Sequence, residues 1–118
     1  MTKPNFNMLP TTKLMAVLNE FRNYDPEMQI QTLMTFLFVS SRPENEPPTI
    51  KDCAEAVGIA QSSASRNVAA LASINRHHES GHQLLHTFEN PMRRTQKLVV
   101  LTPRGKKLLE SVEKMMSN

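Results

Sequence analysis

The segment TIKDCAEAVGIAQSSASRNVAAL, residues 49–71, decides the fold of this chain. Its first part has the pattern of a short amphipathic helix that starts after Thr49. The three-residue spacing of Thr49 and Asp52 is that of a capping box, with Asp in the position usually held by Glu. Gly58 comes directly after the last apolar position, where many helices end on a left-handed residue that glycine adopts at little cost.

A second short helix begins after Gly58 among small polar residues, and its apolar positions are Ala64, Val68 and Leu71. Two short amphipathic helices joined by a glycine turn are typical of a helix-turn-helix, which we assign to residues 49–73. In such a motif the second helix enters the major groove of DNA. An ordinary helical hairpin is the alternative interpretation of this segment.

The basic residues are concentrated in and after the second helix of this motif. Residues 1–60 hold five Lys or Arg and seven acids, whereas residues 61–107 hold eight Lys or Arg and two acids. A polar distribution of charge of this kind is expected when one face of a protein binds phosphates. With 118 residues and 39% hydrophobic content, the chain is predicted to form one domain, residues 1–118.

Two helices are predicted before the helix-turn-helix. Residues 1–10 are expected to form an irregular arm, after which Thr11 or Thr12 caps a helix that ends near Tyr24. The sequence Asp25-Pro26-Glu27 predicts the start of a largely apolar helix that reaches Ser41 and forms the centre of the core. The proline-rich segment 42–48 is predicted to be a loop.

A β-hairpin and a last helix are predicted after it. Residues 82–89 and 96–101 have strand patterns and are separated by the turn NPMRR, so that residues 82–101 form a wing. Thr102 and Pro103 then predict the start of a helix over 102–116. The predicted fold class is mainly α (α+β): a winged helix-turn-helix domain with a two-stranded β-hairpin wing and flanking N- and C-terminal helices.

From residue 49 to residue 112 the sequence resembles the MarR family of bacterial transcription regulators. The similar segments are AEAVGIAQSSASRNVAAL, the wing tip NPMRR and LTPRGKKLLESV, which joins the last wing strand to a capped helix. The family usually has an aspartate before the wing arginines, where this chain has Met92. The resemblance implies that the protein binds double-stranded DNA as a transcription regulator, with a recognition helix in the major groove and a wing arginine at the minor groove.

The candidate DNA-binding residues lie on two of these elements. On the recognition helix, the resemblance assigns groove contacts to Gln61, Ser62, Ser63, Ser65 and Arg66. On the wing it assigns them to Arg93 and Arg94, and Lys97 is predicted to neutralise the phosphate backbone. The serines and Gln61 have a second interpretation, in which they only cap the helix, and the arginines a second one as a solvated turn.

No enzyme activity, cofactor or metal is predicted. The sequence has no recognisable nucleophile–base pair and no phosphate-binding glycine loop. The histidines at 77, 78, 82 and 86 have no accompanying aspartate or cysteine, although histidine is a common metal ligand. The single Cys53 is expected to be a small buried apolar residue in a reducing cytoplasm, and no membrane segment is predicted.

A homodimer is predicted from the two ends of the chain. The apolar faces of residues 14–21 and 108–116 exceed the needs of one small core, and such surplus is typical of an interface. Two other functions remain open: a winged-helix adaptor that binds protein, and an accessory factor in DNA replication or partition. The DNA target and any small-molecule effector are not predicted.

Overall fold

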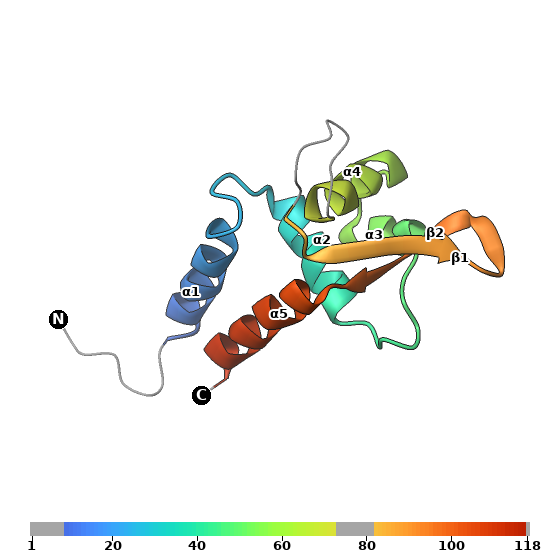
Figure 1. Ribbon diagram of the computed structural model, residues 1–118. Helices are drawn as coiled ribbons and strands as arrows, with labels where there is room; N and C mark the ends of the chain where they lie inside the picture. Colours follow the sequence, from blue (N-terminus) through green and yellow to red (C-terminus); the bar gives the residue numbers. More distant parts are fainter. Residues whose placement is uncertain (1–8, 73–81, 118) are drawn as a thin grey trace.

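In the part of the chain that the structure describes, five helices and one antiparallel hairpin follow each other in the order that the sequence predicts (Figure 1). The computed structural model describes residues 9–72 and 82–117. Its elements are α1 (Pro10–Arg22), α2 (Ile30–Ser40), α3 (Ile50–Val57), α4 (Gln61–Leu71), β1 (Leu85–Asn90), β2 (Arg93–Leu101) and α5 (Pro103–Met116). The predicted fold class is therefore confirmed. The arm up to residue 8 and the polar connector 73–81 lie outside the described residues.

The helix-turn-helix forms through the local interactions that its sequence predicts. The Asp52 N–H donates to Thr49 Oγ1, and the Thr49 N–H donates to Asp52 Oδ2, each at 3.0 Å, so the capping box is complete. Gly58 is left-handed with φ of 79°, and its N–H donates to the Ala54 carbonyl at 2.8 Å. These two ends confine α3 to eight residues and turn the chain into α4.

Helix α2 occupies the centre of the domain, as expected, but it starts later than Pro26. The Glu27 N–H donates to Asp25 Oδ1 at 2.9 Å, which closes a local turn instead of capping a helix. Gln29 is still extended, so the helix begins at Ile30. The predicted threonine cap of α1 is also wrong: Pro10 opens that helix after Leu9, which makes no side-chain cap.

The wing differs from the predicted strands at both ends. Residues 82–84 are outside β1 because the Leu84 N–H donates to the Leu71 carbonyl at 2.8 Å instead of to β2, although the Leu84 carbonyl still accepts from the Thr102 N–H at 3.0 Å. At the tip, only Pro91 and Met92 form the turn, and β2 begins at Arg93 instead of Gln96. The paired residues shift from Glu89↔Lys97 to Asn90↔Arg93, so β2 bulges between them.

One core joins these elements. Phe21 of α1 and Phe36 of α2 are fully buried and meet edge to face, with ring centroids 5.5 Å apart. The Cys53 side chain is also fully buried. Its burial, and to a smaller extent the nearby negative charge of Asp52, raises the pKa of its thiol to about 11. The expectation that Cys53 is a buried apolar residue is confirmed. Among the described residues, no helix has the length and apolar character that crossing a bilayer requires.

The wing and α5 meet so closely that only glycine fits at position 105. Thr102 caps α5 by accepting from the Gly105 N–H at 2.9 Å, and its own hydroxyl donates to the Gln83 carbonyl at 2.7 Å. A Cβ atom built on Gly105 would lie 2.2 Å from the Leu84 carbonyl oxygen. This close approach holds the start of the wing against the first turn of α5.

We predict that Gly105→Ala destabilises the domain by about 3 kcal/mol, because the new methyl group collides with backbone atoms that cannot move aside. Gly58→Ala is the matched control. No atom lies within 4 Å of a Cβ at Gly58, so that change costs only the left-handed backbone strain, about 1 kcal/mol. Urea unfolding of the two variants measures both values. An equal or smaller loss for Gly105→Ala would contradict the close packing.

Candidate nucleic-acid interface

Helix α4 presents most of the predicted groove-facing residues to solvent. Gln61, Ser62, Ser65 and Arg66 are exposed, and Ser63 is half-buried. The opposite side of the helix is buried through Ala64, Asn67, Val68 and Leu71. The helix therefore has a packed face that fixes its position and a polar face that is available to a ligand.

A buried polar pair, which the sequence analysis missed, fixes α4 on α2. Thr32 Oγ1 donates to Asn67 Oδ1 at 3.1 Å, and both side chains are 7% exposed. The other Asn67 atom, Nδ2, is buried without a hydrogen-bond partner among the described residues. Because a buried polar pair tolerates few alternative packings, this contact restricts how α4 can rotate or slide on α2. In the sequence, the only signal for this pair was that Thr32 and Asn67 are polar residues at helical spacing from apolar ones.

The N-terminal end of α4 has amide donors without a side-chain cap. Ala60 is the N-cap residue and no side chain within the described part of the chain accepts there. The interpretation that Gln61 and the serines only cap this helix is thus not supported by its geometry. Arg66 Nη2 donates to Ser63 Oγ at 3.3 Å, so the guanidinium lies beside the first turn. Free amides, the helix dipole and a cation together favour an anion at this end.

The wing carries the second group of predicted residues. Arg93, Arg94 and Lys97 are all exposed on β2. Lys97 pairs in register with Glu89 of β1, which offsets part of its charge, whereas the two arginines lie next to the turn. The base of the wing is held to the helix-turn-helix, because the Val99 N–H donates to the Pro48 carbonyl at 2.9 Å and Leu98 bridges to Thr49. The wing tip projects away from α1 and from the end of α5 (Figure 1).

Two other basic residues of the positive segment are engaged elsewhere. The Arg104 guanidinium lies over the Tyr24 ring, 4.9 Å from its centroid, and Nε donates to the His82 carbonyl at 3.1 Å. Lys106 forms an ion pair with Glu44 of the 42–48 loop. The hydrogen bond from Lys106 and the positive charge of its ammonium group lower the pKa of the Glu44 carboxyl. These contacts tie parts of the fold together. Arg66, Arg93, Arg94 and Lys97 are exposed and remain candidate phosphate ligands; Lys107 is exposed too, on α5.

The histidines do not form a metal site in the described part of the chain. His82 Nε2 lies 3.3 Å from Asp25 Oδ2, and the His86 ring stacks on Phe88 with centroids 6.2 Å apart. Across residues 9–72 and 82–117, no three His, Cys, Asp or Glu side chains gather as metal ligands. His77 and His78 lie outside the described residues.

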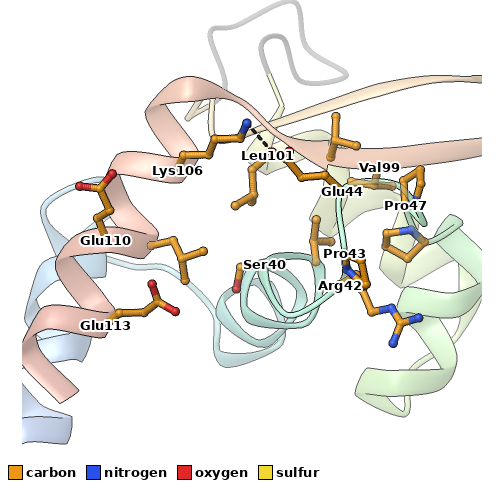
Figure 2. Close-up of a pocket in the computed structure, with 14 residues that line it drawn as sticks. Ser40, Arg42, Pro43, Glu44, Pro47, Val99, Leu101, Lys106, Glu110 and Glu113 are labelled. Atoms are coloured by element: carbon orange, nitrogen blue, oxygen red, sulfur yellow. Dashed lines mark ion pairs between the residues drawn. The ribbon is translucent and has the colours of Figure 1, made fainter. Parts of the chain in front are cut away.

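A pocket of about 520 Å³ lies on another part of the surface (Figure 2). It is bounded by the end of α2, the 42–48 loop, β2 and α5, and its floor includes Val39, Val99 and Leu101. The side chains of Glu44, Glu110 and Glu113 also line it, with the Lys106–Glu44 ion pair across one side. Arg42 and Lys106 line the pocket as well, and Lys106 pairs with Glu44, so Glu110 and Glu113 are the carboxylates that would repel phosphate there. The candidate DNA-binding surface is therefore not expected to extend into this pocket.

The two-helix motif, the paired wing and the packed α5 define a winged helix-turn-helix protein. Solved structures of the same fold include the MepR–DNA complex from S. aureus, with 15% identity and a TM-score of 0.71 over 89% of this chain and 77% of that one. They also include RV1404 from Mycobacterium tuberculosis, with 21% identity, a TM-score of 0.66 and coverage of 90% and 65%.

A MarR-family transcriptional regulator from Rhodococcus sp. RHA1 is similar too, at 17% identity with a TM-score of 0.62. The matched region covers 90% of this chain and 66% of that regulator, which is about two thirds of the regulator's length. No protein-family model and no curated protein matches the sequence. At these identities the likeness establishes the fold alone, and the predicted winged-helix fold is confirmed.

Proposed function

We propose that this protein is a sequence-specific regulator of transcription that binds double-stranded DNA. The observation that carries the proposal is the arrangement of α4, whose buried face is locked on α2 while its polar face and uncapped amides are open to a ligand. A helix of this kind, in a domain that also has a projecting basic hairpin, matches the shape and charge of a DNA groove. The similar MepR structure is itself a complex with DNA.

In this proposal the two elements have different roles. Residues Gln61, Ser62, Ser65 and Arg66 face the base edges and nearby phosphates of the major groove, and Ser63 orients the Arg66 guanidinium. Arg93 and Arg94 lie at the minor groove, where a narrow A·T-rich segment attracts arginine. Lys97 neutralises the phosphate backbone. The guanidinium group of Arg66 can donate two hydrogen bonds to guanine. Such a contact would give a preference for one base, which phosphate contacts alone do not give.

Binding-site selection from random duplexes, followed by titration at several salt concentrations, tests this function. We predict a preferred sequence whose affinity falls steeply with salt, with a log–log slope of about −0.9 for each phosphate neutralised. Arg66→Ala is expected to weaken the selected site by about 1–3 kcal/mol and to relax one base position.

Arg42→Ala is the matched control, because it removes the same charge from the rim of the carboxylate-lined pocket and should leave binding unchanged. A protein adaptor would show no duplex affinity at any salt concentration. A replication or partition factor would bind DNA without a preferred site near a promoter.

We also propose that two copies associate through α1 and α5. Large apolar side chains are exposed on α1, directly before it and at the end of α5: Leu9 at 68%, Leu14 at 52%, Met15 at 73% and Met116 at 51%. The described chain is elongated, with extents of 55 × 30 × 26 Å, and α1 packs mainly on α5 at one end. A second copy is the occupant that fits, since a two-fold dimer covers the same patch on both chains.

We predict that the intact protein sediments as a dimer at micromolar concentration and that Met15→Asp makes it monomeric, because the new charge would be buried in the interface. The dimer should require an inverted repeat with half-sites roughly 34 Å apart. Met92→Asp is the control for sedimentation without DNA, since Met92 is also exposed, at 91% against 73% for Met15, but lies on the wing. A monomeric mass for the wild-type protein, with and without DNA, would disprove the association.

A further inference from the structure

The tip of the wing ends in an exposed apolar side chain that the proposed dimer does not cover. Met92 is 91% exposed, more than any other large apolar residue of the described chain; Phe88, the other exposed one on the wing, is 37% exposed. Pro91, the other residue of the turn, is exposed as well. The outermost point of the wing is therefore apolar, and the next two residues, Arg93 and Arg94, are cationic.

Local hydrogen bonds hold this tip in one shape. The Met92 N–H donates to Asn90 Oδ1 at 3.0 Å, and Asn90 Nδ2 donates to Gln96 Oε1 at 3.2 Å across the bulge. Pro91 fixes its own backbone angle, and Asn–Pro is a favoured start for a tight turn. Because Asn90 braces both sides of the turn, Met92 is presented outward without the entropy cost of ordering a loose loop.

We propose that Met92 enters the minor groove of duplex DNA as a wedge between two base pairs, guided there by Arg93 and Arg94. This inference rests on the proposed DNA-binding function and adds a mechanism to the wing. Apolar side chains, Met and Pro among them, serve as wedges in minor-groove proteins, where they unstack a base step and kink the duplex. The unbranched thioether side chain adapts to the flat faces of the bases.

The wedge would make the wing sensitive to DNA deformability. Pyrimidine–purine steps such as TA and CA unstack most easily, so the site facing Met92 should favour one of them. The arginines supply the attraction to the groove and the methionine supplies the deformation. The acid nearest to Met92 in sequence is Glu89, which pairs in register with Lys97 and is separated from the tip by Asn90. Little negative charge on the wing therefore opposes entry of the tip into the groove.

The experiment uses the full chain and its selected duplex, with 2-aminopurine placed in turn at each step of the segment facing the wing. Wild-type protein should raise the fluorescence at one step by unstacking it, and end-labelled duplex should show a bend in the range of roughly 20–90° by energy transfer. Met92→Gln, which keeps the length but adds polarity, should abolish the fluorescence rise and reduce the bend. Met92→Leu should retain both.

The charge and wedge contributions are separable. The double variant Arg93→Ala/Arg94→Ala should bind more weakly with a shallower salt dependence, whereas Met92→Gln should keep the wild-type salt dependence and lose about tenfold in affinity only at sites with a TA or CA step. Equal fluorescence and bend for wild type and Met92→Gln would overturn the wedge while leaving DNA binding intact. Absence of binding to any duplex would instead refute the proposed function.

Discussion

The backbone of Leu84 is the point on which the positions of α4 and the wing, the candidate DNA-binding elements, depend. Its N–H donates to the Leu71 carbonyl at the end of α4, and its carbonyl accepts from Thr102 at the start of α5. The same carbonyl lies so close to Gly105 that a side chain there has no room. One residue thus sets the position of α4, the first strand of the wing and the last helix relative to each other. A shift at this junction would move α4 and the wing apart.

The rest of the structure separates surfaces of different character. The polar face of α4 and the basic wing are at one end, and the exposed apolar residues of α1 and α5 are at the other. Between them lies a pocket with three carboxylates. Ion pairs such as Lys106–Glu44 and contacts such as Arg104–Tyr24 engage basic residues that would otherwise extend the positive surface. The candidate DNA-binding surface is therefore smaller than the basic segment of the sequence.

The sequence predicted the elements whose signals are local, and it failed where tertiary contacts decide. The capping box of α3, the left-handed Gly58 and the Thr102 cap of α5 each depend on a few neighbouring residues, and all three are confirmed. The start of α2 was predicted wrongly because Asp25 closes a turn with Glu27. In sequence, such a turn looks the same as the start of a capped helix. Leu84 lies outside the strand because its N–H donates to the carbonyl of Leu71, a residue of another element. The Thr32–Asn67 pair was missed for the same reason.

Chemical-shift mapping of the nitrogen-15-labelled protein during titration with its selected duplex tests most directly whether α4 and the wing form one DNA-binding surface. We expect the largest amide shifts at Gln61–Arg66 of α4 and at Asn90–Lys97 of the wing. The amides of Glu110 and Glu113, beside the carboxylate-lined pocket, should remain unchanged. Shifts concentrated on that pocket or on α1, with none on α4, would contradict the account.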